Sequence, residues 1–429
     1  MIAILKREWK SYFQNITGWL FIAAVLALYG LYFLAYNLRA GYPYVSYTLS
    51  AISFIMLIAV PILTMRSMAE ERHSRTDQLV LTAPVSLGKM IFGKFLAMVG
   101  VFTVAVAVIA VTPLVLAAFG TVPMGENYVA VLGFWLYGCT CIAVGMLASA
   151  LTESQVIAAV VAFAFLFLGY MMNSITGLIG DHLVTKVLGA YDLYTPLQSF
   201  MSGCLDLTGV VYFVSVTGLC LFLTCQCVQK RRWSMTTKKL TTGMFSVAMI
   251  VVGFAVAVAV NLVVKEMPSS WTAVDATSTK LYSLTDTTKD YVKNLSQDVT
   301  IYVLSSEKSA DSTLAETLQR YEDLSKHLNV VYKDPAKSPN FYQRYTDSAP
   351  SQNSMIVVSD ARSRVVDYSD IYEYSYDYST YSSSVDGYDA EGQLTSALQY
   401  VTKADSELPV IYEITGHGEN TLSGGFSEA

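Results

Sequence analysis

Long apolar stretches fill the first part of the chain, and short alternating ones fill the rest. A helix that spans a membrane needs roughly 20 mostly apolar residues, and seven stretches before residue 265 of the 429 meet that length. These stretches are Thr17–Tyr36, Tyr47–Met65, Phe95–Phe119, Tyr128–Leu151, Val156–Thr176, Val210–Cys227 and Met244–Val264. The pattern therefore predicts a polytopic α-helical membrane domain over residues 16–264, with Pro113 as a kink in the third span.

Residues 1–15 precede the first span and have two distinct sides at helical spacing. The apolar side holds Ile2, Leu5, Trp9 and Phe13, and the basic side holds Lys6, Arg7 and Lys10. This pattern predicts an interfacial amphipathic helix in the plane of the lipid headgroups. It does not match the charged region and apolar core of a cleavable signal peptide.

The longest charged insertion between the spans covers residues 66–94. We expect a helix over Met65–Ala83, and its charged positions are Glu70, Glu71, Arg72, Arg75 and Asp77. Glu71 and Arg75 are four residues apart, where opposite charges meet on a helix. Pro84 is expected to end this helix and Ser86 to cap the next one. A polar helix at the membrane face suits docking of a soluble partner, and an ordinary solvated loop is the alternative.

Basic residues in the loops predict the orientation of the spans. The loops of one set, which include the N-terminus and residues 66–94, 152–155 and 228–243, hold 13 Lys and Arg residues. The loops of the other set hold Arg39 and Lys186. Because loops rich in Lys and Arg stay inside the cell, the N-terminus is expected in the cytoplasm and residues 265–429 outside it.

The loop over residues 177–209 is more apolar than a simple connection. Leu178, Ile179, Leu183, Val184, Val187 and Leu188 recur at helical spacing, and Tyr194, Pro196, Phe200 and Met201 continue the apolar pattern. We expect a short helical pair that dips into the outer leaflet, because non-helical backbone at that depth must be buried in protein or in contact with water.

Residues 265–429 have the composition of a soluble α/β domain. Strands are expected over Val299–Leu304, Asn329–Tyr332, Ser354–Ser359, Arg364–Tyr368 and Leu408–Thr415, with helices over Ala310–Leu328 and Glu391–Lys403. The stretch Ser369–Asp389, rich in Tyr, Ser and Asp, is expected to be a surface loop. Alternating strands and helices favour a mainly parallel sheet covered on both faces. The sheet is expected to be incomplete at Ala429, as in a truncated domain.

Charge divides the chain at about the same place. Residues 1–265 carry a net charge of +7, and residues 266–429 carry −13. An acidic soluble part argues against a nucleic-acid partner, since phosphate binding needs a basic surface. All six cysteines precede residue 228, mostly inside apolar runs, so packing is favoured over a metal site and none is predicted.

Several motifs carry a resemblance to known families. The stretch MRSMAEERHSRTDQLVLTAPVSLGKMIFGKFLA resembles the coupling region of type-2 ABC exporter permeases, and YTPLQSFMSGCLDLTGVVYF resembles the outer-leaflet segment and last core span of that group. Further on, Leu281–Thr285, Arg320-Tyr321, Asp334-Pro335 and Thr415–Glu419 are similar to the extracytoplasmic domain of a GldG-like gliding-motility-associated auxiliary component. The membrane half is similar to its GldF-like permease companion.

These resemblances imply a domain organisation. Residues 16–230 would be a six-span permease domain with a cytoplasmic coupling helix over residues 66–90. A basic linker over residues 231–243 and an additional span over residues 244–264 would follow, and residues 265–429 would be the auxiliary domain. The permease would lie in a bacterial plasma membrane, in contact with lipid and paired with a second permease.

The chain has no G-x-x-x-x-G-K-[ST] phosphate loop, so we do not expect it to be an enzyme. The resemblance implies separate ATPase subunits, which would bind ATP and Mg and push on the 66–94 region. Glu70, Glu71, Arg72 and Arg75 are the predicted ATPase-coupling residues. A solvated charged face is the alternative for each of them.

The sequence also contains features of other functions. Gly416, His417, Gly418 and Glu419 follow a predicted strand, where open α/β sheets bind ligands. A tight turn is the favoured interpretation of these glycines, and a hydrolase that uses His417 is disfavoured because no nucleophile–base pair accompanies it. The main alternative to a permease is a non-transporting membrane scaffold whose exterior α/β module binds a partner.

Overall fold

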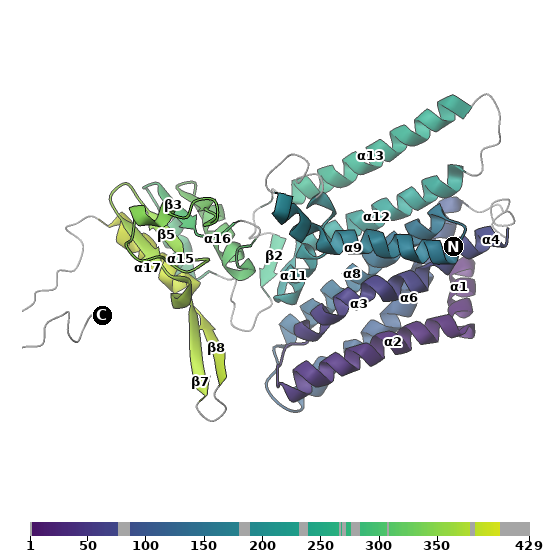
Figure 1. The fold of residues 1–429 in the computed structure, drawn as a ribbon, viewed down its shortest axis with the longest axis horizontal. Coiled ribbons are helices and arrows are strands. Elements are labelled where there is room, and N and C mark those ends of the chain that lie inside the picture. The colour runs from purple at the N-terminus through teal and green to yellow at the C-terminus, as the bar shows by residue number, and fades with distance from the viewer. Residues whose placement is uncertain are drawn as a thin grey trace, which may run out of the picture. The chain divides into compact units, whose positions relative to one another are not determined.

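The computed structural model describes residues 2–75, 86–179, 189–230, 239–265, 267, 272–275, 284–306, 309–377 and 382–403. The chain forms two compact units, Met1–Ser283 and Leu284–Ala429. Figure 1 shows the helices of the first unit and the small sheet of the second.

The first unit is helical, as its apolar stretches predict. Its helices are α1 (Ile2–Gln14), α2 (Ile16–Phe33), α3 (Ser46–Thr64), α4 (Arg66–His73), α6 (Leu87–Ile109), α7 (Thr112–Ala117), α8 (Met124–Leu151), α9 (Gln155–Ile179), α11 (Thr195–Met201), α12 (Leu207–Lys230) and α13 (Lys239–Lys265), with π-helical η1 (Leu34–Arg39) and 3-10 helix η2 (Gly189–Tyr191). Seven helical stretches of the described residues are long and apolar enough to cross a membrane, each at a predicted span. The polytopic α-helical membrane domain is therefore confirmed.

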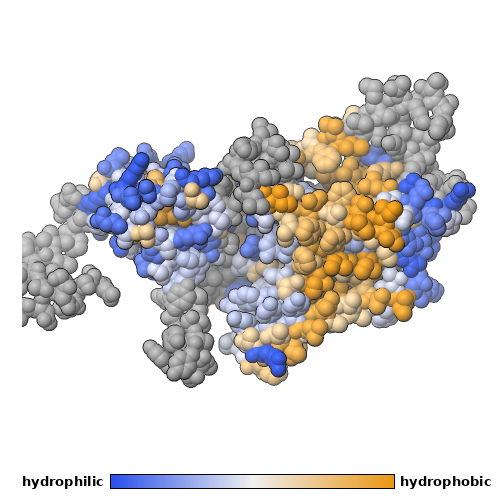
Figure 2. Space-filling model, in the orientation of Figure 1, coloured by the Kyte–Doolittle hydropathy of each residue, from blue (hydrophilic) through white to orange (hydrophobic). Residues whose placement is uncertain are grey.

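Helix α8 is the centre of this bundle. It packs against α3, α6, α9, α11 and α12, and 83% of its most apolar window is buried. Phe134 and Tyr137 are fully buried in its middle, and Gly138 lets the Phe102 ring of α6 approach. By contrast, α13 packs on α12, and none of its apolar window is buried. Figure 2 shows the apolar belt on one face of the helices and a hydrophilic cap at the end where Figure 1 places α4.

Pro113 divides the third span more sharply than the predicted kink. Helix α6 ends at Ile109, and Pro113 lies in the first turn of α7. Proline suits that position because its missing N–H would have no partner in the first turn of a helix anyway. The Thr112 hydroxyl donates to the Ile109 carbonyl at 2.7 Å and also contacts the Tyr29 hydroxyl at 2.6 Å, so the break is supported by α2.

One helix of the predicted outer-leaflet pair lies in the described part of the chain. Helix α11 packs on α8 and is followed by the short strand β1 (Cys204–Asp206), which pairs in antiparallel fashion with β2 (Ala273–Asp275). The first half of the predicted pair falls mostly on residues 180–188, outside the described residues. Helix α13 is therefore joined to the rest of the unit by backbone pairing as well as by its packing on α12.

The second unit holds a four-stranded sheet with the order β4-β3-β5-β6, and its strands are β3 (Val299–Val303), β4 (Leu328–Tyr332), β5 (Met355–Val358) and β6 (Ser363–Val366). Only β3 and β4 are parallel, and the other two pairings are antiparallel. The predicted mainly parallel sheet is therefore wrong. Residues 359–362 connect β5 to β6, and so short a connection makes a hairpin, because a parallel crossover needs a dozen or more residues.

A hairpin replaces the surface loop predicted for Ser369–Asp389. Strands β7 (Tyr372–Asp377) and β8 (Ser382–Tyr388) pair in antiparallel fashion, with a bulge after Glu373. The sequence alternates Tyr with Glu, Ser or Asp over Tyr372–Asp377, and a period of two is typical of a strand. The predicted loop is therefore wrong: the abundance of Ser and Asp is typical of loops, but the period of two is that of a strand.

The core of the second unit lies between the sheet and its helices. Val299, Ile301 and Val303 of β3 are buried on one face and meet apolar residues of the helices. These helices are α15 (Asp286–Lys293), α16 (Ser312–Leu324) and α17 (Ala390–Thr402), and the 3-10 helices are η3 (Phe341–Arg344) and η4 (Tyr368–Asp370). The predicted strand Leu408–Thr415 and the loop Gly416, His417, Gly418 and Glu419 lie outside the described residues.

Candidate functional site: the charged end of the helical bundle

The predicted coupling helix is shorter than its charge pattern suggests. Helix α4 ends at His73, so the prediction of a helix to Ala83 is wrong within the described residues. The Ser74 hydroxyl donates to the Glu70 carbonyl at 2.8 Å, and Arg75 adopts a left-handed φ of 56°. Both features are typical of helix ends. Because Arg75 lies beyond the helix, the expected helical pairing with Glu71 is not realised.

The next helix begins where the sequence predicts. Ser86 has the extended backbone of an N-cap before α6, although its side chain makes no capping hydrogen bond. Residues 76–85, which include Pro84, lie outside the described residues. The coupling helix predicted for residues 66–90 is thus α4, a segment outside the described residues and the first turn of α6.

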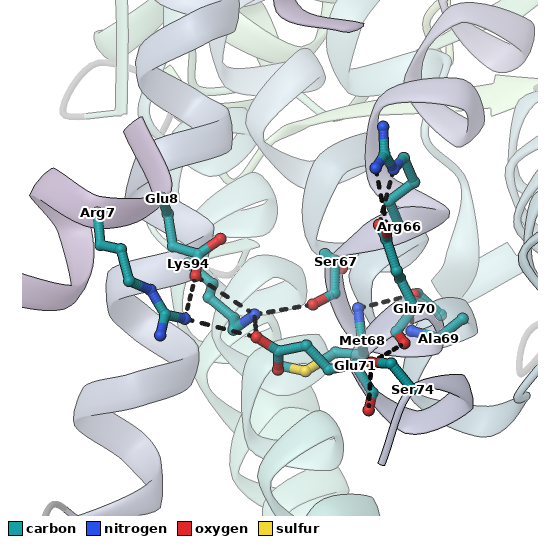
Figure 3. A network of polar contacts seen from close by, with 11 residues as sticks. Arg7, Glu8, Arg66, Ser67, Met68, Ala69, Glu70, Glu71, Ser74 and Lys94 are labelled. Carbon is teal, nitrogen blue, oxygen red and sulfur yellow. Dashed lines mark hydrogen bonds and ion pairs between the residues drawn. The ribbon is translucent and has the colours of Figure 1, made fainter. Parts of the chain in front are cut away.

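Glu71 pairs with a buried lysine of α6 instead. The Lys94 ammonium lies 2.6 Å from Glu71 Oε1 and donates to the Ser67 carbonyl at 3.0 Å (Figure 3). Its side chain is 3% exposed and that of Glu71 is 19% exposed. A buried ammonium needs a counter-charge and further hydrogen-bond acceptors, and α4 supplies both to α6.

Helix α1 completes this charge cluster. Lys94 also lies 3.6 Å from Glu8, and Arg7 lies 2.6 Å from Glu8 and 3.5 Å from Glu71. Two cations and two carboxylates therefore alternate across α1, α4 and α6 (Figure 3). Trp9 fixes α1 on α6, since a Cβ on Gly100 would lie 1.7 Å from its ring.

Of the other two predicted coupling residues of α4, Glu70 is bonded within the helix and Arg72 reaches the α8–α9 turn. Glu70 accepts two hydrogen bonds from Arg66, at 2.7 and 2.9 Å, and Arg66 also donates to the Thr17 hydroxyl of α2. Arg72 pairs with Glu153 in the α8–α9 turn at 2.5 Å and donates to the Leu151 carbonyl at 3.4 Å. Helix α4 is thus tied to α2 and to the α8–α9 turn as well as to α1 and α6.

The structure gives the four predicted coupling residues different environments. Glu71 is largely enclosed, Glu70 and Arg72 are partly exposed at 43% and 27% of their side chains, and Arg75 is exposed. Their contact with an ATPase stays a prediction. Lys94 was not predicted as a residue of this site. Its signal in the sequence is its position on an apolar helix face, where a charged side chain needs a partner.

The arrangement ties the helices together at this end of the bundle. Its groups are fixed in ion pairs and backbone hydrogen bonds that join five helical elements at one end of the bundle. In the part of the chain that the structure describes, no three His, Cys, Asp or Glu side chains are grouped so as to hold a metal.

Comparison with known families finds a similarity for the membrane part of the chain. Residues 39–228 match the family model of ABC-2 family transporter proteins. The helical bundle is therefore similar to the membrane domain of ABC-2 transporters. The match includes α4, Lys94 and α8 and begins after α1 and α2. It supports the predicted permease of an ABC transporter, in a multi-pass membrane protein, and it implies partnership with an ABC ATPase.

The second unit is matched by a different family. Residues 278–371, which span α15 and β3 to β6, match a domain of unknown function, DUF7088. No curated protein matches the chain. The resemblance to a GldG-like auxiliary domain therefore stays a prediction.

Proposed function

We propose that this protein is the permease subunit of an ATP-driven exporter, and that a separate ATPase docks on the charged end of its first unit. The observation that supports this proposal is the set of polar contacts that joins α4 to α1, α2, α6 and the α8–α9 turn. A force on α4 would therefore act on all of these elements, and no span would move without the others.

Coupling follows from this connectivity. Helix α4 continues α3 beyond Met65 and is held against α6 by the Glu71–Lys94 pair, so a push on α4 would move two spans together. Helix α8 contacts both spans and also α9 and α12, so it would pass the motion through the bundle. ATP and Mg are bound by the partner ATPase, and its closure supplies the force.

The rest of the assembly follows from the predicted topology. The charged end faces the cytoplasm of a bacterial cell, and the second unit lies outside the membrane as a GldG-like auxiliary domain that binds a partner or substrate. Two permease copies pair within the lipid bilayer. The substrate that best fits walls without charged residues in the middle of the spans is amphiphilic or lipid-like.

The test is reconstitution with the cognate ABC ATPase. Glu70→Lys and Arg72→Glu change partly exposed charges without removing the counter-charge of buried Lys94, so they probe docking rather than folding. We expect each to reduce co-purification of the ATPase. Arg39→Glu, an exposed residue of η1 outside the charged end, is the matched control.

Two results would count against the proposal. Unchanged ATPase association in both charge reversals would remove the docking site from α4. A complex that hydrolyses ATP without any change in the spans would favour the non-transporting scaffold.

A further inference from the structure

A serine of α8 is inserted into the backbone of the α3–α4 junction. The Ala69 amide donates to Ser149 Oγ at 3.0 Å, and Ser149 Oγ donates to the Met65 carbonyl at 3.0 Å. In a continuous helix that amide and that carbonyl would bond to each other, because they are four residues apart. The hydroxyl therefore replaces one rung of the helical ladder, at the residue where α3 gives way to α4.

This hydroxyl uses its full bonding capacity. Ser149 Oγ also accepts from the Met68 amide at 3.1 Å, so it makes one donated and two accepted hydrogen bonds. The residue is fully buried. A buried hydroxyl with all its bonds made to one backbone segment fixes the position of that segment relative to α8.

The sequence of α8 allows this close approach. Gly145 lies one turn before Ser149 on the same side of the helix, and a Cβ on Gly145 would lie 2.3 Å from the Thr64 hydroxyl oxygen. The Thr64 hydroxyl bonds to its own helix at the Val60 carbonyl, 3.0 Å away. Small residues at positions 145 and 149 thus place the hydroxyl within reach of the junction.

We propose that Ser149 is a positioning residue for coupling, which holds a hinge at Met65 in one of two hydrogen-bonded states. This inference rests on the proposed function, in which α4 receives the force of the ATPase. In the state seen here, the hydroxyl is inserted between the Ala69 amide and the Met65 carbonyl, while Met65 between α3 and α4 keeps helical backbone angles of φ −54° and ψ −34°. In the other state, the Ala69 amide bonds directly to the Met65 carbonyl and α3 continues into α4.

Both states keep the Ser149 hydroxyl and the Met68 and Ala69 amides hydrogen-bonded. When the hydroxyl withdraws, the Met68 and Ala69 amides return to the Thr64 and Met65 carbonyls. Ser149 can then donate to the Gly145 carbonyl of its own helix, a bond that serine commonly makes inside helices. Because the two states exchange similar hydrogen bonds, the free-energy difference between them is small enough for ATP-driven docking to shift it.

The inference is tested with Ser149→Ala, which removes the inserted hydroxyl and leaves the helix propensity of α8 favourable. Ser53→Ala is the matched control, since Ser53 is also fully buried and its hydroxyl donates to Ser50 within its own helix. Spin labels carried by non-canonical residues at Ile58 and His73, both exposed, report the orientation of α4 relative to α3 in the full-length protein.

We expect Ser149→Ala to shift the distance distribution between the two labels, while Ser53→Ala leaves it unchanged. In the reconstituted complex, Ser149→Ala should lower kcat for ATP about fivefold, the equivalent of one hydrogen bond. The KM for ATP and the co-purification of the ATPase should stay unchanged.

The distance measurement needs no ATPase, so its outcome is separate from that of the proposed function. A distribution in Ser149→Ala identical to that of the unmodified protein would overturn the hinge, even if the ATPase binds. A shifted distribution with no ATPase association in the unmodified protein would support the hinge and contradict the docking proposal.

Discussion

The ammonium of Lys94 lies 2.6 Å from the carboxylate of Glu71, although only 3% of the lysine side chain is exposed. Glu71 belongs to α4 and Lys94 to α6, and the Ser67 carbonyl supplies a second acceptor 3.0 Å from the ammonium. Breaking such a pair from one side leaves a buried charge without compensation, whereas replacing both partners by apolar groups is often nearly neutral.

The Glu71–Lys94 pair should therefore respond asymmetrically to substitution. We expect Glu71→Leu to destabilise the first unit by about 3–5 kcal/mol, because Lys94 would lose its nearest counter-charge. The double variant Glu71→Leu with Lys94→Met should recover most of that loss. Thermal unfolding of the detergent-solubilised full-length protein measures both, and a double variant as unstable as Glu71→Leu alone would show that the pair is not the source of the effect.

The packing of α1 on α6 gives a second prediction. A Cβ on Gly100 would lie 1.7 Å from the Trp9 ring, so Gly100→Ala should displace α1 and cost about 1–3 kcal/mol through overpacking. A Cβ on Gly30 of α2 would have no atom within 4 Å. Gly30→Ala is therefore the control and should not destabilise the protein. Equal unfolding temperatures for the two variants would mean that Trp9 does not hold α1 in place.

The Arg72–Glu153 pair should contribute little to stability. Glu153 has 63% of its side chain exposed, and exposed ion pairs contribute about 0–1 kcal/mol. Arg72→Ala should therefore leave the unfolding temperature almost unchanged and still weaken ATPase association if α4 is the docking element. A large loss of stability in Arg72→Ala would instead make this residue a structural one.

Asp367, which follows β6, gives a pH-dependent prediction for the second unit. Partial burial raises the pKa of Asp367. Four hydrogen bonds lower it by more than burial raises it, and they come from the amides and hydroxyls of Ser369 and Ser351. The pKa of Asp367 therefore lies well below its ordinary value. A carboxylate with a lowered folded-state pKa stabilises the fold above its unfolded pKa, about 4, and that contribution is lost as the pH falls below it.

Asp367→Asn should therefore destabilise the second unit at pH 7 by about 1 kcal/mol. The asparagine side chain keeps part of the hydrogen bonding, but hydrogen bonds to a charged group are stronger than those to an amide. The difference from the unmodified protein should shrink as the pH falls from 5 towards 3. Hydrogen exchange of the β5 and β6 amides, corrected for intrinsic rates, measures it, with the exposed Asp360→Asn as control. A difference that does not change with pH would contradict this account.

The spans were predictable because hydrophobic length is a local property of the sequence. Each of the seven stretches coincides with a helical segment that is long and apolar enough to cross a membrane. The sheet was less predictable, since the strands were found but their directions were not. The four-residue connection between β5 and β6 fixes an antiparallel pair, and this signal lay in the sequence.

The position of the charged cluster was predictable, but its contacts were not. Spacing along one helix paired Glu71 with Arg75, yet the partner of Glu71 is Lys94, 23 residues away on another helix. Local charge patterns carry no information on how helices pack, so that pairing and the insertion of Ser149 at Met65 could not be derived from periodicity. The early end of α4 had a visible signal in Ser74, which competes for helix carbonyls.

The central claim is that the exposed end of α4 contacts the nucleotide-hydrolysing partner on the cytoplasmic side. It is tested most directly by a photo-crosslinking residue at His73, exposed at the end of α4, compared with one at Tyr42, exposed in the loop before α3 on the predicted outer side. In membranes that contain the cognate ATPase, the account predicts a crosslink to the ATPase from position 73 and none from position 42. A crosslink from position 42 alone would contradict both the orientation and the coupling role of α4.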